Sequence, residues 1–398
     1  MSIYLVTLLN VLNSIALRGS RVLMSLFAIQ LGAGAFEIGL LIAVSLVFQL
    51  FLGIYAGRVA DRYGFRLPIL LGSLGSSLAM LVPWLLPDLT GLYGSRALTG
   101  LSFIFFAVAI QNLAASMDGP EMRARNLSTF TLGGSISGMI APLLVGFSID
   151  HFGHAQSYLL LACLAILPML ALFTFPQIVP AAHGRKSKAA QSNVLELMRI
   201  APLRRTLLAG AIIFSGTDLL SFYVPIYGAS IGLSASTIGG ILGAYAAAQF
   251  VVRAVMPALV KRWGEEKILT ASLLASGAAY PLFPFFQNPW ILTLIAFTLG
   301  LGLGCGQPLS MMLTYNRSPD GRTGEVLGLR ITINKIVQIG VPLVFGVVGS
   351  AFGLMTVFVS NAVILAAGAY LNQQAGQDPS GVSGQGSGGP KPVRGQDA

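Results

Sequence analysis

Three charged side chains lie deep inside long runs of apolar sequence. Arg18 and Arg21 stand three positions apart between residues 3 and 31, and Asp218 stands alone between residues 207 and 230. A charge near the centre of a bilayer-spanning helix costs roughly 2.5–3.5 kcal/mol on insertion scales, so it is rarely found there without a role. Arg18 and Asp218 are 200 positions apart. Opposite charges at equivalent positions of two such runs predict a cavity with a polar centre.

Asp218 is the one carboxylate inside a predicted helix away from the helix ends, and three roles are open to it. Burial favours the protonated acid, whereas nearby cations favour the carboxylate. A group balanced between these effects can take up and release protons near neutral pH, as coupling to protons requires. The alternatives are a static counter-ion for Arg18 or Lys335 and a direct contact with a bound solute.

Two further patterns place polar groups on single helix faces. In the first run the polar residues are spaced by 4, 4, 3 and 4 positions, which puts them on one face of a helix. They are Asn10, Ser14, Arg18, Arg21 and Ser25. A second stripe, between residues 326 and 349, contains Asn334, Lys335 and Gln338. Arg253 and Arg330 lie nearer the ends of their runs, where long side chains can reach water, and we expect structural roles for them.

The elements that carry these residues are predicted from composition and length. The chain of 398 residues is 55% hydrophobic and only 10% charged, against about 25% charged in soluble proteins. A helix of about 20 apolar residues crosses about 30 Å of hydrocarbon. Polar faces with the 3.6 period of a soluble helix are absent, so a soluble protein is excluded. Twelve spans are predicted, at 3–31, 36–57, 68–86, 92–116, 127–149, 156–176, 207–230, 236–259, 268–286, 290–315, 326–349 and 353–371.

The basic residues predict the orientation in the membrane. Six of the 24 Lys and Arg residues lie inside spans, and the other 18 all fall on one side of the predicted topology. By the positive-inside rule that side, with both termini, is cytoplasmic. The net charge of +10 therefore needs no nucleic acid to explain it. The first run has no basic segment before it and contains two arginines, which favours a retained helix over a signal peptide.

The chain reads as two similar halves. A shift of 200 positions superposes eleven further pairs, which are mostly glycine and proline. We predict a six-helix bundle over residues 1–176, a cytoplasmic linker over 177–205 and a second six-helix bundle over 206–372. Residues 373–398 contain no apolar run and are expected to be a disordered tail. The paired residues are Gly32/Gly232, Ala35/Ala235, Ile38/Ile238, Gly39/Gly239, Gln49/Gln249, Arg62/Arg262, Gly64/Gly264, Gly100/Gly300, Pro142/Pro342, Gly146/Gly346 and Gly153/Gly353.

One loop carries a family resemblance. The segment Gly57-Arg-Val-Ala-Asp61-Arg62-Tyr-Gly64-Phe-Arg66 closely resembles the signature loop of the major facilitator superfamily, Gly-x-x-x-Asp-Arg-x-Gly-x-Arg. A decayed copy ends in Lys261-Arg262-Trp-Gly264, where Lys261 replaces the acid. Arg96-Ala-Leu-Thr-Gly100 and Gly138-Met-Ile-Ala141-Pro142 resemble two shorter motifs of the same family, the second of them associated with antiporters. The resemblance covers the whole chain and implies an all-α membrane protein of twelve transmembrane helices in two pseudo-symmetric halves.

The signature loop also has a physical interpretation of its own. Gly57 and Gly64 allow a close helix contact and a tight turn. Asp61 can pair with Arg62, with Arg66 or with a nearby helix N-terminus, whose dipole favours a carboxylate. Such contacts at the cytoplasmic mouth would hold the halves together in one state. The alternative is that the arginines only set the topology.

The family architecture implies a central path, with Arg18, Arg21, Arg96 and Lys335 on its wall. Four cations then face one anion, Asp218. Unpaired buried cations are expensive, which predicts an anionic solute. The alternative is that Arg96 is a motif residue that tunes a proton site.

Other chemistry finds little support. Cys163 and Cys305 lie inside apolar runs, so no disulfide framework is indicated. His151 and His154 have no further ligands nearby, and no metal is expected there. Phosphate-loop and nucleophile–base patterns are absent, so we expect neither an ATP-driven pump nor an enzyme, and no cofactor.

These observations predict a monomeric transporter in the bacterial cytoplasmic membrane, surrounded by lipid. It would be a secondary active transporter that moves a small organic anion by alternating access, coupled to protons. Export is slightly favoured, because the helix that contains Pro142 partly resembles the antiporter motif and the first helix resembles that of drug exporters. The alternatives are a proton-coupled uptake symporter and a non-transporting membrane sensor on the same scaffold.

Overall fold

The computed structural model of the chain describes residues 3–117, 122–174, 197–319 and 323–377. Within these ranges twelve helices are long and apolar enough to cross a membrane, which confirms the predicted all-α membrane fold. The helices of the first group are α1 (Ile3–Gln30), α2 (Ala35–Tyr63), α3 (Arg66–Leu85), α4 (Leu89–Ser116), α5 (Arg123–Phe152) and α6 (His154–Thr174). The second group comprises α8 (Ala201–Ser230), α9 (Ala235–Trp263), α10 (Glu265–Ala279), the 3-10 helix η2 (Tyr280–Phe285), α11 (Pro289–Asn316), α12 (Thr323–Phe352) and α13 (Leu354–Gln377).

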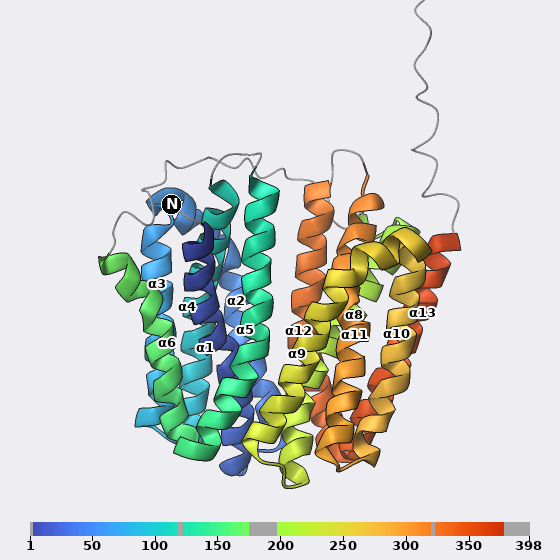
Figure 1. Cartoon of the computed structure of the whole chain (residues 1–398). Coiled ribbons are helices and arrows are strands. Elements are labelled where there is room, and N and C mark those ends of the chain that lie inside the picture. The colour runs from blue at the N-terminus through green and yellow to red at the C-terminus, as the bar shows by residue number, and fades with distance from the viewer. Residues whose placement is uncertain (1–2, 118–121, 175–196, 320–322, 378–398) are drawn as a thin grey trace, which may run out of the picture.

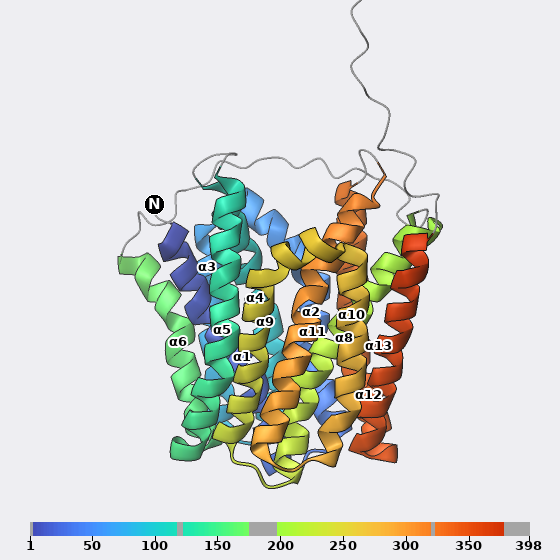
Figure 2. The ribbon, with the colours of Figure 1, turned by 45° about the vertical axis from the view of Figure 1, so that its right-hand side comes forward.

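The two groups stand side by side (Figures 1 and 2). Within the first group α1 packs against α4, α5 and α6, and within the second α8 packs against α11, α12 and α13. Three main pairs join the groups, namely α5 with α9, α2 with α12, and α1 with α8. The start of α1 and the end of α13 lie at the same end of the molecule, which we call the terminal face (Figure 1). The opposite end is called the far face.

The 200-residue repeat is visible in the backbone. Six glycines have a positive φ, and they form the three repeat pairs Gly32/Gly232, Gly64/Gly264 and Gly153/Gly353, with φ between 77° and 84°. Each of them ends a helix or follows its last turn, where a side chain would be strained. The two halves therefore turn the chain at equivalent positions with the same backbone geometry.

Two seams join the groups toward the far face, and the repeat also relates these seams. A Cβ added at Gly239 of α9 would lie 2.3 Å from the carbonyl oxygen of Pro142 on α5. In the other seam, a Cβ added at Gly39 of α2 would lie 2.5 Å from the carbonyl oxygen of Pro342 on α12. Small residues let transmembrane helix backbones approach this closely. A glycine and a proline from the predicted repeat thus close each seam.

The helix boundaries differ most from the predicted spans in four places. Helix α2 continues to Tyr63, past the predicted end at 57. Helix α8 begins at Ala201, so Arg204 and Arg205 lie in its first turn or just beyond it and not in the linker. The predicted span 268–286 is not one continuous helix, because it changes to a 3-10 helix at Tyr280, next to prolines 281 and 284. Helix α13 extends to Gln377, past the predicted end at 371. Most of the predicted linker and the rest of the tail lie outside the described residues.

Candidate functional site

Helix α1 carries Arg18 and Arg21 at the middle of the molecule. It is surrounded by α4, α5, α6 and α8, yet the Arg18 side chain is exposed. A Cβ added at Gly138 of α5 would lie 3.4 Å from Arg18 Nη1. The charged side chains that act on Arg18 electrostatically are Arg21 and Arg253, the latter on α9 of the second group. The Arg18 guanidinium therefore faces the space between the two groups.

Asp218 on α8 is brought close to two cations from other helices. The side chains that attract it are Arg21 of α1 and Lys335 of α12, and Asp218 itself is partly exposed. Between described side chains, the only ion pair within 4.0 Å joins Arg317 to Glu266. Asp218 is thus held near two positive charges without direct contact. The 200-residue repeat pairs Asp218 with Arg18, whereas in the structure the arginine that attracts Asp218 is Arg21.

The polar stripe on α12 divides into two parts. Lys335 Nζ donates a hydrogen bond of 3.2 Å to Gln338 Oε1, one turn along the helix, and both side chains are partly exposed. Asn334 is only 6% exposed, and its Oδ1 atom is buried without a hydrogen-bond partner. Lys335 and Gln338 therefore lie with Asp218 in the central group, while Asn334 points into the protein.

Arg96 occupies a different environment from the other cations. It is 2% exposed. Its Nη1 donates to Ser20 Oγ of α1 over 3.2 Å and its Nη2 to Ser45 Oγ of α2 over 3.1 Å. The guanidinium therefore ties α4 to α1 and α2 inside the first group, behind the side chains that face the second group. The family motif placed Arg96 on the wall of the path, because a motif does not indicate how deeply a side chain is buried.

Arg253 and Arg330 each donate a hydrogen bond to a backbone carbonyl group. Arg253 Nε donates to the Gly304 oxygen over 3.2 Å, and its Nη1 donates to Ser135 Oγ of α5 over 3.3 Å. Arg330 is buried and its Nη2 donates to the Gln307 oxygen over 3.2 Å. These bonds agree with the structural roles expected for both residues. Arg330 is buried and so does not extend to water as expected, whereas Arg253 is partly exposed. Arg253 also joins the central charged group, which the sequence did not indicate.

The signature loop comprises the last turns of α2, the turn at residues 64 and 65, and the start of α3, at the terminal face. Gly64 turns the chain with φ 79°, and the Arg66 Nη2 donates to the Leu172 oxygen of α6 over 3.4 Å. The Arg62 guanidinium lies 5.3 Å from the ring centre of Tyr63, and the repeat copy places Arg262 at 5.1 Å from Trp263.

Gly57 and Asp61 are the remaining glycine and acid of the signature loop. A Cβ added at Gly57 would meet no described atom within 4 Å, so the close helix contact expected there is absent. The side chain of Asp61 lies outside the described residues, and its predicted pairing stays a prediction.

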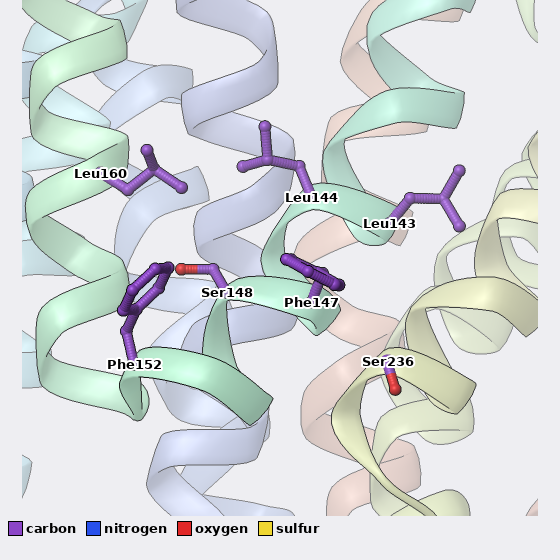
Figure 3. A pocket seen from close by; sticks show the side chains of 7 residues that line it. All are labelled: Leu143, Leu144, Phe147, Ser148, Phe152, Leu160 and Ser236. Atoms are coloured by element: carbon purple, nitrogen blue, oxygen red, sulfur yellow. The ribbon is translucent and has the colours of Figure 1, made fainter.

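A separate apolar pocket of about 620 Å³ lies near the far face, between the ends of α5, α6 and α9 (Figure 3). None of its lining residues is charged, and Phe147 is 58% exposed. The pocket shares no lining residue with the charged central group and is distinct from it. Its lining comprises Leu143, Leu144, Phe147, Ser148, Phe152, Leu160 and Ser236.

The two histidines of the far face make ring contacts. His151 stacks on Phe147 with ring centres 3.9 Å apart, and His154 stacks on Phe27 at 5.5 Å. In the part of the chain that the structure describes, no three His, Cys, Asp or Glu side chains gather in a way that could hold a metal ion.

Comparisons with known proteins agree with this architecture. The chain is 25% identical over 335 residues to a multidrug resistance protein MdtG of Salmonella paratyphi A, with 82% of each chain covered. It is also 25% identical over 334 residues to the MdtG of Enterobacter lignolyticus (strain SCF1), covering 82% of this chain and 79% of the relative.

Solved structures share the fold at low sequence identity. A bacterial homologue of the human lysosomal transporter Spinster, in an inward-facing and occupied conformation, superposes with a TM-score of 0.77 at 14% identity, covering 94% of this chain and 96% of the other. A POT family transporter in complex with 5-aminolevulinic acid gives a TM-score of 0.77 at 13% identity, with coverages of 94% and 95%. The sequence profile of the Major Facilitator Superfamily matches residues 6–342 and again 206–392. With twelve membrane-spanning helices, the repeated halves and this match, the chain belongs to the major facilitator superfamily of membrane transporters.

Proposed function

We propose that this protein is a secondary active transporter that exports a small organic anion in exchange for protons. The observation that carries the proposal is the charge of the central group. Arg18, Arg21, Arg253 and Lys335 come from three helices, and among the described side chains near them Asp218 is the one carboxylate. An anion is the solute that such a surplus of positive charge would attract.

The hydrogen bonds of these cations support an anionic solute. Arg253 and Lys335 donate to neutral carbonyl, hydroxyl and amide oxygens, which solvate a cation without neutralising it. Arg18 is exposed at the middle of a membrane-spanning helix. Because removing a charge from water is costly unless a counter-charge compensates it, a carboxylate or phosphate entering between the groups would lower the free energy of this arrangement.

Coupling to protons is assigned to Asp218. Since no Lys or Arg nitrogen in the described part of the chain lies within 4.0 Å of it, the carboxylate is free of a direct ion pair and can bind a proton or release one. Protonation would cancel its attraction for Arg21 and Lys335, which belong to different groups of helices. A proton on Asp218 would thus weaken the attraction of α8 for α1, across the boundary between the groups.

Alternating access would follow from movement of residues 1–176 against residues 206–372. The groups meet along the seams of α5 with α9 and α2 with α12, and within each group the helices pack on one another. Export is favoured because the relatives named above are multidrug resistance proteins. The terminal face is assigned to the cytoplasm from the one-sided distribution of Lys and Arg.

The test uses inside-out membrane vesicles and a panel of organic anions, with and without a pH gradient. Asp218→Asn should abolish gradient-driven accumulation while substrate binding persists, because the amide keeps the size of the side chain and cannot titrate. Arg21→Ala should weaken binding, most for the most anionic compounds. Arg199→Ala, which removes an exposed charge at the terminal face, is the matched control and should leave both unchanged.

The double variant Arg21→Ala/Asp218→Asn separates coupling from a structural ion pair. Breaking one partner of a buried pair costs more than removing both. If Asp218 merely neutralises Arg21, the double variant recovers gradient-driven transport, and the assignment of Asp218 to proton coupling is wrong. If Asp218 carries the proton, the double variant stays uncoupled. Preference of the unaltered protein for cations over anions in the panel contradicts the assigned solute class.

A further inference from the structure

The far-face end of α5 reaches across to the second group through one carboxylate. Asp150 Oδ1 accepts a hydrogen bond of 3.1 Å from the Ala235 backbone N–H, and its Oδ2 accepts one of 2.8 Å from the Ser236 N–H. These two N–H groups belong to the first turn of α9, where a helix has no internal acceptors for them. A negative charge at this position is also favoured by the helix dipole.

The bonds of Asp150 are unusual among the contacts of the two groups. Where donor and acceptor are both described residues, every hydrogen bond between the first and second groups joins α5 to α9. The third such bond, from Arg253 to Ser135, lies near the middle of the helices. Asp150 is therefore the one charged acceptor that holds the far-face ends of the two groups together within the described part of the chain.

The repeat provides an internal comparison for Asp150. Both seams have the same backbone approach, since a Cβ on Gly146 would lie 2.4 Å from the Ala235 oxygen and one on Gly346 would lie 3.1 Å from the Ala35 oxygen. The position equivalent to Asp150 in the second half is Ser350. Its hydroxyl donates to the Val347 oxygen of its own helix over 2.9 Å and does not reach α2. The seam of α5 with α9 is thus stabilised by a hydrogen-bonded carboxylate, whereas the seam of α2 with α12 is stabilised by backbone packing.

We propose that Asp150 is a latch that holds the far face closed, and that the seam of α5 with α9 controls opening of the transporter on that side. For the far face to open, the ends of α5 and α9 must separate, and both hydrogen bonds to Asp150 must then break. Between its described residues the seam of α2 with α12 has no such bond, and we expect it to separate once the seam of α5 with α9 has opened. This role concerns the balance between conformations and holds whatever solute the protein carries.

The experiment measures opening directly, without a transport assay. Ser25 on α1 is 2% exposed and lies one turn beyond Arg21 toward the far face, on the same helix face. Ser25→Cys therefore creates a thiol that a membrane-impermeant maleimide reaches from the far side when the seam opens. The exposed Cys163 is replaced by alanine, and the buried Cys305 is retained. The initial rate of alkylation then reports the fraction of open molecules.

Asp150→Asn should raise the alkylation rate about tenfold, because it removes the charge from two hydrogen bonds and keeps the side-chain shape. Ala235→Pro should raise it by a smaller factor. Proline suits the first position of a helix but removes one of the two donors and leaves the carboxylate in place. Ser350→Ala is the matched control and should not change the rate. Ser350→Asp should lower the rate, because it offers the free first-turn N–H groups of α2 an equivalent acceptor.

Equal rates in the parent, Asp150→Asn and Ala235→Pro, including no alkylation in any of them, overturn the proposal. If Asp150→Asn does not fold, Ala235→Pro decides, since it leaves every charge of the protein intact. An equal increase in Ser350→Ala and Asp150→Asn would also overturn it, because the two seams would then be equivalent. None of these outcomes depends on the solute or on proton coupling, so they leave the proposed function to its own test.

Discussion

Adding one methyl group at Gly239 should force the seam of α5 with α9 apart. The Cβ of alanine at this position would lie 2.3 Å from the carbonyl oxygen of Pro142, whereas ordinary contacts begin at 3.4 Å. The obstructing atom is backbone, so no side chain can rotate to make room. The two helices must separate locally by about 1 Å, the difference between those two distances.

The size of the effect follows from the cost of overpacking. An extra methyl group in a well-packed interior costs typically about 1–3 kcal/mol, and here that cost applies only while the seam is closed. The same free energy corresponds to a change of about 5- to 150-fold in the ratio of two conformations. Gly239→Ala should therefore increase the open fraction at the far face by at least about fivefold.

Alkylation of Ser25→Cys measures this change, and the chain offers a matched control. A Cβ added at Gly240, the next residue of α9, would meet no atom within 4 Å. Gly240→Ala has the same effect on the backbone entropy of the same helix without the collision, and its alkylation rate should equal that of the parent. Equal rates in Gly239→Ala and Gly240→Ala would refute the reasoning, because the close backbone approach would then not limit opening.

Two further predictions concern stability and orientation. Arg96→Met should leave the melting temperature in detergent equal or higher, because it replaces a buried cation, hydrogen-bonded to the hydroxyls of Ser20 and Ser45, by an apolar chain of similar length. Arg96→Ala should lower the melting temperature by leaving a cavity. A similar loss in both variants would contradict this account. Reporter domains fused after residues 152 and 372 should lie on opposite sides of the membrane, with the second in the cytoplasm, and activity of both on one side would show that the predicted topology is wrong.

Periodicity and composition alone determined much of this protein. The positions of the twelve spans, the 200-residue repeat and the glycine turn at 64 could be predicted because they depend on local properties. These are the length needed to cross the hydrocarbon and the conformations open to glycine. The set of charged residues within the spans was also visible, since charges are rare in such segments.

Only the tertiary structure decided which of these charges meet. Arg18 and Arg21 are three residues apart and so differ by only about 60° around the helix axis. Rotation of α1, fixed by its contacts with α4, α5, α6 and α8, turns Arg21 toward Asp218 and Arg18 toward Arg253. The depth of Arg96 was likewise hidden, because it depends on the serines that neighbouring helices present.

Asp150 illustrates the same limit. In the sequence it is one acid near a loop, close to His151 and His154, which are the more obvious candidates for a ligand site. Its partners are backbone N–H groups 85 and 86 positions away. Because every residue except proline has a backbone N–H, the residue types do not indicate such partners. A sequence can specify where a helix begins, but which carboxylate lies over that helix start is determined by how the two halves pack together.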